Sequence, residues 1–311
     1  MDAREALAPA DVAEANRVEG RAPAFDIRPA AGQATPLVFA SPHSGRLYPD
    51  DLIAASILDA SAIRRSEDAF VDVLAAGGPA RGAPLIAARY ARAYIDVNRE
   101  PYELDPAMFE DELPAFARGR TARIAAGLGA IARVVGEGQE IYARKLTFAE
   151  ARGRIDTVHA PYHAALAGLL SQAKSRFGAA VLIDWHSMPS AAAATVNEGA
   201  RGRRAIDFVL GDRFGSSCAP AVVEMVETTL EGMGYAVARN SPYAGGYTTE
   251  FYGRPSEGQH ALQIEINRAL YLNERSLSRH GGFDRLARNL ELLVDKLAGA
   301  DWAKLLGASA T

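Results

Sequence analysis

The sequence of 311 residues contains a single cysteine, Cys218, so no disulfide bond can form within the chain. We expect Cys218 to be a small buried apolar side chain rather than a nucleophile. No apolar run approaches the roughly 20 residues that a membrane-spanning helix needs. The acidic N-terminal stretch also lacks the apolar core of a signal peptide. These absences predict a cytoplasmic protein that has no membrane as a partner.

An excess of positive charge is also missing. The formal net charge is -4 at pH 7, which argues against nucleic acid as a partner. No glycine-rich phosphate loop precedes a predicted helix, and no G-x-S-x-G motif is present, which argues against a serine hydrolase of that type. The expected partner is therefore a small-molecule substrate.

Hydrophobic residues make up 49% of the chain and charged residues 23%, so a substantial core can form. Short apolar runs predict strands at residues 37–41, 84–88, 93–97, 179–186, 205–210, 235–238 and 262–266. Helical spacing predicts helices at 60–76, 121–135, 220–230 and 283–297, and one that begins near Asp156 or at Pro161 and ends at Phe177. This alternation predicts an α/β fold in one domain over residues 36–311, preceded by a loose lead-in over residues 1–35.

Four of the predicted strands end in, or carry, polar residues. These residues are His43 after 37–41, Asn98 and Arg99 after 93–97, His186 at the end of 179–186, and Glu265 in 262–266. Each alone is explained by an ordinary polar strand end. Ligands in open α/β sheets bind beyond the carboxyl ends of the strands, so the four together indicate one site.

The two strand-end histidines suit a metal site. Catalytic zinc commonly takes three protein ligands from His, Asp and Glu and keeps one position open. His43 and His186 are the best candidates, and a carboxylate is the expected third ligand. The adjacent Glu67 and Asp68 supply such a carboxylate, although a solvated face of the predicted helix 60–76 explains them as well.

Three further residues suit the chemistry of a hydrolase. Glu265 lies on a mostly apolar strand, where a buried carboxylate is costly unless it has a function or a partner. It could act as a general base, or it could form an ion pair with Arg268. Arg99 suits a substrate carboxylate because its guanidinium binds one bidentately, and a structural salt bridge is the alternative. Asp184 shares a strand face with His186 and can orient its ring.

The remaining histidines have weaker patterns. His159 and His163 are four residues apart and could form a second metal pair, but Pro161 between them favours a structural role. His260 and His280 have no supporting context, and we expect both to lie on the surface.

Six motifs together resemble those of the N-formylglutamate amidohydrolase family, in order, over roughly positions 36 to 275. They are Ser41-Pro42-His43-Ser44-Gly45, Asp96-Val97-Asn98-Arg99, Asp184-Trp185-His186-Ser187, Leu210-Gly211-Asp212-Arg213, Pro242-Tyr243-Ala244-Gly245-Gly246-Tyr247 and Gln263-Ile264-Glu265-Ile266-Asn267-Arg268. The resemblance implies a three-layer α/β/α domain with a mixed sheet, similar to zinc carboxypeptidases. It also implies metal-dependent hydrolysis of an N-acyl bond that releases formate and glutamate in histidine breakdown.

The resemblance further implies roles for single residues. By motif, His43 and His186 become metal ligands, Glu265 the general base, and Asn98 with Arg99 the clamp for a substrate carboxylate. Zinc is the implied metal, and another divalent ion can replace it.

One position departs from the related carboxypeptidases. Their His-x-x-Glu spacing is absent, because Arg46 stands three residues after His43. Asp68 resembles the acidic position that follows the first strand in the family and is the expected third ligand, with Glu67 second. Two alternatives remain: a deacylase or carboxypeptidase-like hydrolase of another acidic N-acyl amino acid, and a non-catalytic binding protein of the same fold.

Overall fold

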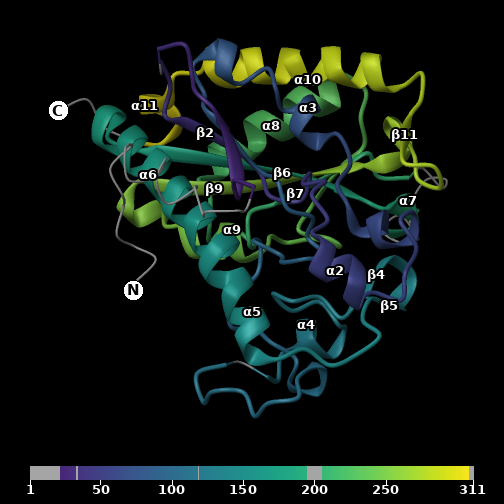
Figure 1. The fold of residues 1–311 in the computed structure, drawn as a ribbon. Helices are drawn as coiled ribbons and strands as arrows, with labels where there is room; N and C mark the ends of the chain where they lie inside the picture. Colours follow the sequence, from purple (N-terminus) through teal and green to yellow (C-terminus); the bar gives the residue numbers. More distant parts are fainter. Residues whose placement is uncertain (1–21, 33, 118, 195–204, 308–311) are drawn as a thin grey trace. The chain divides into compact units, whose positions relative to one another are not determined.

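The computed structural model describes residues 22–32, 34–117, 119–194 and 205–307. Its main sheet has seven strands in the order β1-β3-β2-β6-β9-β7-β8. Figure 1 labels its central strands β2, β6, β9 and β7. The strands are β1 (Phe25–Arg28), β2 (Leu37–Ser41), β3 (Leu85–Ala88), β6 (Ala180–Met188), β7 (Phe208–Gly211), β8 (Val237–Arg239) and β9 (Gln259–Asn267). β2, β6 and β9 run parallel and β7 runs antiparallel to β9, so the sheet is mixed. The predicted α/β class is confirmed.

The chain divides into two compact units. Among the described residues, the first comprises 22–26, 42–68 and most of 87–168, and the second comprises 27–32, 34–41, 69–86, 169–194 and 205–307. The helices of the second unit are α3 (Val71–Leu74), α7 (Ser190–Ala194), α8 (Pro220–Gly232), α9 (Tyr247–Tyr252), α10 (Phe283–Ala298) and α11 (Trp302–Leu305), with short 3-10 turns at Pro79–Arg81, Pro255–Glu257 and Arg268–Leu270. A small hairpin, β10 (Leu272–Asn273) with β11 (Ser278–Arg279), completes it.

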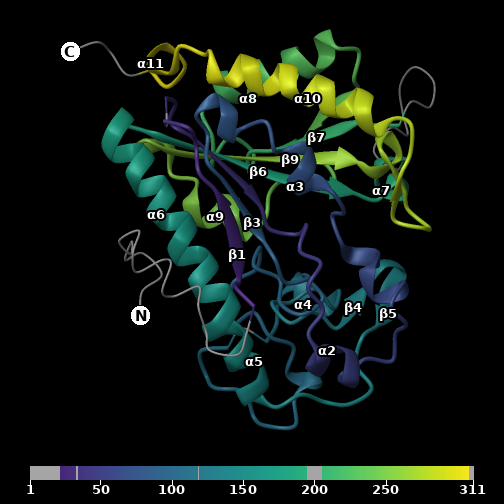
Figure 2. The same cartoon turned by 45° about the horizontal axis from the view of Figure 1, so that its top comes forward.

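The second unit has three layers. α3, α8 and α10 lie on one face of its sheet and α9 lies on the other, where it contacts β6 and β9 (Figures 1 and 2). α10 packs through Leu286, Leu290 and Leu293, whose spacing of three to four residues forms one apolar face. All nine residues of β6 are buried, as expected for a central strand covered on both faces. The predicted α/β/α arrangement is confirmed for this unit.

The first unit contains short helices joined by long loops. The helices are α2 (Asp50–Ala55), α4 (Ala122–Ala125) and α5 (Phe148–Arg154). The loops contain 3-10 turns at Ala62–Ser66, Pro106–Met108 and Gly136–Gly138 and a hairpin of β4 (Val134–Val135) and β5 (Gln139–Glu140). α5 continues through a π-helical turn, Ile155–His159, into α6 (Ala160–Phe177). The predicted helix that ends at Phe177 therefore starts earlier than either Asp156 or Pro161. A capping box between Thr147 and Glu150 fixes the start of α5.

Two predicted helices are wrong in extent. Within 121–135 only α4 is helical, because Gly127 takes a φ of 76° and turns the chain toward β4. Within 60–76 the chain forms a 3-10 turn and α3, separated by an extended residue at Glu67 and a left-handed one at Phe70 (φ 65°). Glu67 and Asp68 therefore stand in a break between helices and not on a helix face.

The predicted strand at 93–97 is also wrong. This segment forms turns, in which the Tyr94 N–H donates to Ala91 O (2.9 Å) and the Arg99 N–H donates to Asp96 O (3.2 Å). Its apolar residues, including Tyr94 and Ile95, are buried, and the segment pairs with no strand among the described residues. The other predicted strands are present, with ends shifted by up to three residues.

The ends of the chain modify the predicted boundaries. Residues 1–21 and 33 of the predicted lead-in lie outside the described residues, while β1 joins the main sheet beside β3. The domain boundary at residue 36 stays a prediction.

Cys218 is buried, and burial raises the pKa of its thiol, which agrees with a small apolar role. No helix among the described residues is long and apolar enough to cross a membrane.

Candidate metal centre and active site

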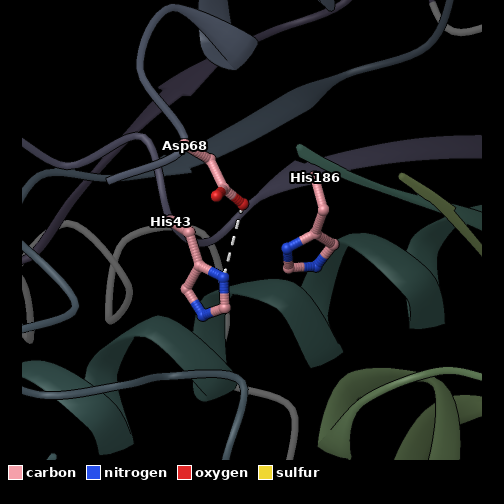
Figure 3. A group of neighbouring side chains, drawn as sticks. All are labelled: His43, Asp68 and His186. Atoms are coloured by element: carbon pink, nitrogen blue, oxygen red, sulfur yellow. Dashed lines mark ion pairs between the residues drawn. The ribbon is translucent and has the colours of Figure 1, made fainter. Parts of the chain in front are cut away.

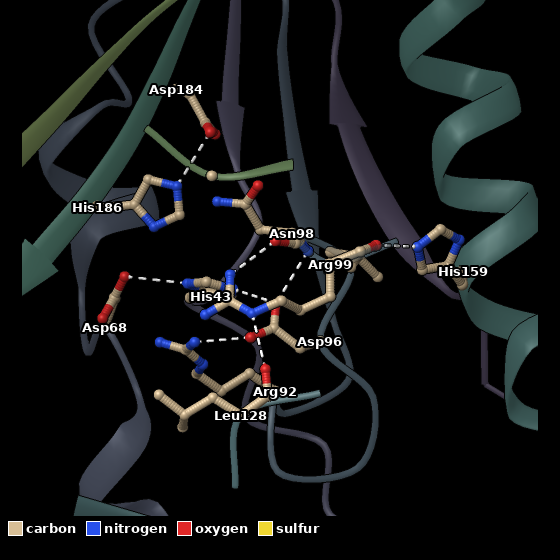
Figure 4. Close-up of polar contacts among 12 residues, drawn as sticks. His43, Asp68, Arg92, Asp96, Asn98, Arg99, Leu128, His159, Asp184 and His186 are labelled. Atoms are coloured by element: carbon tan, nitrogen blue, oxygen red, sulfur yellow. Dashed lines mark hydrogen bonds and ion pairs between the residues drawn. The ribbon is translucent and has the colours of Figure 1, made fainter. Parts of the chain in front are cut away.

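His186 stands near the C-terminal end of β6, and Asp184 lies on the same face of that strand. The His186 Nε2 atom is 3.1 Å from Asp184 Oδ2, close enough for an ion pair (Figure 4). Neither carboxylate oxygen of Asp184 makes a hydrogen bond of good geometry to a described residue, although the side chain is fully buried. Such a carboxylate is costly unless positive charge lies nearby. A cation on the second ring nitrogen of His186 would supply that charge.

His43 follows the end of β2 and is held by a chain of charged groups. Its Nε2 lies 2.6 Å from Asp96 Oδ1, and Asp96 Oδ2 accepts a hydrogen bond from Arg92 Nη2, also at 2.6 Å (Figure 4). Burial alone would raise the pKa of Asp96, but Arg92, His43 and Arg99 hold it well below its usual value. The ionised carboxylate keeps a proton on Nε2, which leaves the His43 Nδ1 lone pair for a ligand.

The contacts of Glu67 and Asp68 distinguish the two carboxylates that could be the third metal ligand. Asp68 Oδ2 lies 3.5 Å from His43 Nδ1 (Figure 3). The Asp68 N–H also donates to His43 O at 3.0 Å. Glu67 is engaged elsewhere, because its Oε2 accepts from Arg64 Nε at 2.9 Å and from the Tyr48 hydroxyl at 3.1 Å. The geometry therefore favours Asp68 as the third ligand candidate.

His43, Asp68 and His186 each offer one ligand atom, and these atoms all lie within 4.8 Å of one another (Figure 3). Two ligand atoms on one tetrahedral zinc, each about 2.0–2.2 Å from it, lie roughly 3.3–3.6 Å apart. The 3.5 Å between His43 and Asp68 matches that spacing. Two imidazoles with carboxylate partners and one buried carboxylate thus fit zinc. The group of His43, Asp68 and His186 is the only set of three possible metal ligands found among the described residues.

The Asn98–Arg99 segment is held by two buried histidines. His159 Nε2 donates to Arg99 O at 2.9 Å, and His163 Nε2 donates to Val97 O at 2.7 Å. Burial lowers the pKa of His159 to about 4 and that of His163 well below its usual value, so both rings are neutral at pH 7. These contacts agree with the structural role favoured for the pair.

The guanidinium of Arg99 is fixed by main-chain carbonyls. Its Nε donates to Leu128 O at 2.9 Å and its Nη1 to Asn98 O at 2.8 Å (Figure 4). Its Nη2 has no hydrogen-bond partner within the part of the chain that the structure describes. Burial lowers the pKa of this group, which still remains protonated at neutral pH. A held guanidinium with one nitrogen left over suits an anionic ligand.

Glu265 is placed by strand register. It pairs with His186 across the parallel strands β6 and β9, so the two side chains lie on the same face. It is 7% exposed, and its Oε1 accepts a hydrogen bond from Gln263 Nε2 at 2.9 Å. Arg268 Nε donates to Ser187 Oγ at 3.2 Å. The alternative ion pair of Glu265 with Arg268 stays a prediction.

Two residues with a clear place in this region were not predicted. Asp96 orients His43, and Gln263 contacts Glu265. Asp96 stands two residues before Asn98, but the sequence gives no sign that it reaches His43.

Of the two histidines predicted to lie on the surface, His280 is exposed as predicted. The prediction for His260 is wrong, because this residue is only 4% exposed and its Nδ1 accepts the Ala219 N–H.

Comparisons with known proteins agree on one family. Residues 35–272 match the model of the N-formylglutamate amidohydrolase family. N-formylglutamate deformylase of Pseudomonas aeruginosa is 29% identical over 78% of this chain and 84% of its own length. The deformylase of Pseudomonas putida is 28% identical over 77% and 82%. A crystal structure of N-formylglutamate amidohydrolase from Ralstonia eutropha JMP134 covers 88% of this chain and 97% of its own, with a TM-score of 0.82 and 40% identity. The chain therefore belongs to the N-formylglutamate amidohydrolase family.

Proposed function

We propose that the protein hydrolyses the N-formyl amide of N-formyl-L-glutamate to formate and L-glutamate, with a divalent metal held by His43, Asp68 and His186. The observation that carries this proposal is the convergence of these three buried ligand candidates. The names of the relatives from Pseudomonas and Ralstonia support the substrate. A place in histidine degradation follows from the family resemblance alone.

The donor set favours zinc over a metal that prefers oxygen, because two of the three candidate ligands are imidazole nitrogens. When bound, zinc lowers the pKa of water to about 7 and polarises a carbonyl group. Asp96 and Asp184 hold the Nε2 sides of His43 and His186, which leaves both Nδ1 atoms as ligand atoms.

We assign Glu265 as the general base. Its carboxylate accepts the proton of the water that adds to the formyl carbon. It then delivers that proton to the amide nitrogen as the C–N bond breaks, so that formate and the free amine leave. Arg99 is assigned to a carboxylate of the substrate, with Asn98 beside it, because its held guanidinium keeps Nη2 for a ligand.

The experiment combines metal analysis with turnover of purified protein on N-formyl-L-glutamate and a panel of other N-acyl amino acids. We expect about one zinc per chain and preference for N-formyl-L-glutamate. His186→Ala should lose metal and activity together, whereas His280→Ala, at an exposed histidine, should keep both.

Three results would contradict the proposal. Full metal occupancy in His186→Ala would remove this residue from the metal site. Preference for a different acyl group would favour the deacylase alternative. A metal-loaded protein without turnover on any member of the panel would favour a binding protein of the same fold.

A further inference from the structure

Gln263 lies in β9, two residues before Glu265, on the same face of the strand. Its side chain is 4% exposed, so its amide must find hydrogen-bond partners within the protein. The function proposed above gives Gln263 no role. Its two amide atoms nevertheless connect two features of the second unit, a glycine-containing loop and the carboxylate of Glu265.

The hydrogen bonds of Gln263 fix the orientation of its amide. The Gly246 N–H donates to Gln263 Oε1 at 2.8 Å, and Gln263 Nε2 donates to Glu265 Oε1 at 2.9 Å. A main-chain N–H can only donate, so it selects the oxygen of the amide and turns the NH₂ group toward Glu265. The reversed amide would place two donors against each other at Gly246 and two acceptors at Glu265.

The loop reaches Gln263 because glycines leave room for it. Gly211 of β7 is the register partner of Gln263, and a Cβ atom at Gly211 would lie 2.8 Å from the main chain of Ala244 and Gly245. Gly245 has a φ of 122°, and a Cβ there would overlap the Thr249 hydroxyl. The two glycines thus allow the loop to lie close to the sheet, where the Gly246 N–H meets Gln263.

We propose that Gln263 is a positioning residue that holds the Glu265 carboxylate in one orientation for proton transfer. With Oε1 held by Gln263, the rotation of the carboxylate is restricted and Oε2 keeps a defined direction. This inference rests on the proposed role of Glu265 as the general base.

A purely structural role for Gln263 makes different predictions. If Gln263 only ties the loop to β9, then any side chain that accepts the Gly246 N–H should serve. Gln263→Glu has the same shape and keeps that acceptor, but in its ionised form it offers no donor to Glu265 and places a second carboxylate beside it. Gln263→Met has similar length and removes both hydrogen bonds.

The experiment measures kcat and KM on N-formyl-L-glutamate for metal-loaded variants. Losing a hydrogen bond to a charged group costs about 1.5–3 kcal/mol, so both Gln263 variants should lose kcat by roughly 10- to 100-fold with KM changed little. Gln259→Met is the matched control, because Gln259 lies at the start of the same strand, and it should keep wild-type kcat.

A double-mutant cycle separates positioning from structure. If Gln263 acts through Glu265, adding Gln263→Met to Glu265→Gln should lower the residual kcat by less than about 3-fold. Wild-type kcat in Gln263→Glu, or equal losses in both backgrounds, would overturn the inference. So would a lowered melting temperature with unchanged kcat per folded molecule in Gln263→Met.

A crystal structure of metal-loaded Gln263→Met tests the inference without turnover. The Glu265 carboxylate should occupy more than one orientation there, and a single unchanged orientation would overturn the proposal. If the wild type fails to hydrolyse every N-acyl amino acid tested, the proposed function fails, whereas the orientation of Glu265 in the two structures still decides the role of Gln263.

Discussion

Strand β9 and the segment Ala91–Arg99 both carry residues to which we assign a function, but they hold these residues by different means. Glu265 is fixed by the register of a central strand, in which its partner on β6 is His186. Arg99 stands on turns that pair with no strand in the part of the chain that the structure describes, and its main chain is held by side chains, including His159. One region uses the regular pattern of a sheet and the other uses buried polar contacts.

The difference shows where each region should be sensitive to change. A strand residue keeps its place if the substituted side chain has the same size, since the main-chain hydrogen bonds remain. A turn segment depends on the polar groups that hold its carbonyls, because a buried carbonyl without a partner is costly. Substitutions in β9 should therefore affect chemistry first, and substitutions around Ala91–Arg99 should also affect stability.

The largest effect is expected at β9. Glu265→Gln has nearly the same size but cannot accept a proton, so it should keep the fold and the metal while kcat falls roughly 10²- to 10⁴-fold. Turnover, metal content and melting temperature measured on this one variant test the assignment. Glu257→Gln, at an exposed glutamate just before β9, is the control and should behave as the wild type.

Two outcomes would give Glu265 a different role. Loss of metal together with activity would make it a ligand. A lowered melting temperature with unchanged activity per folded molecule would make it a structural residue, and β9 would then resemble the turn segment in its sensitivity.

A smaller effect is expected at Arg99. Arg99→Lys keeps the charge but loses the planar fork and the two donors that bind Leu128 O and Asn98 O. We expect kcat/KM for N-formyl-L-glutamate to fall roughly 10- to 100-fold, the scale of a lost charge-assisted hydrogen bond. Arg152→Lys, at a side chain that is 66% exposed, is the matched control. An equal loss on a substrate without the bound carboxylate would show that Arg99 does not recognise it.

The sheet could be predicted from sequence because its pattern is local. The apolar run before His186 and the alternation around Glu265 each specify a strand and a face, and both strands are present. Parallel strands bring their C-terminal ends to one edge of a sheet, which is why His43 and His186 could be paired from sequence.

The turn segment could not be predicted because its partners are remote. Residues 93–97 have the composition of a strand, but apart from local turn hydrogen bonds they are held by distant positions, including His163, 66 residues away from Val97. The link between Asp96 and His43 spans 53 residues and has no local signal either. The preference for Asp68 over Glu67 came from the family resemblance, and its physical reason, the contacts of Arg64 and Tyr48 with Glu67, has no local signal.

The smallest effect on catalysis is expected at His159, where the stability of the fold should change instead. The unfolded chain takes up a proton on this ring below about pH 6.5, whereas burial lowers the pKa of the folded ring to about 4. Unfolding therefore binds a proton between these values, so the contribution of His159 is complete above about pH 6.5 and is lost as the pH falls toward 4. At pH 5 the loss should be about 2 kcal/mol.

His159→Gln tests this difference because glutamine can still donate to Arg99 O but does not titrate. The free energy of unfolding, measured by denaturant titration at pH 7 and pH 5, should fall more steeply in the wild type than in the variant. His280→Gln, at an exposed ring, should follow the wild type. Equal slopes in the wild type and His159→Gln would mean that the ring is hydrated in the folded protein, and the turn segment would then need another explanation for its order.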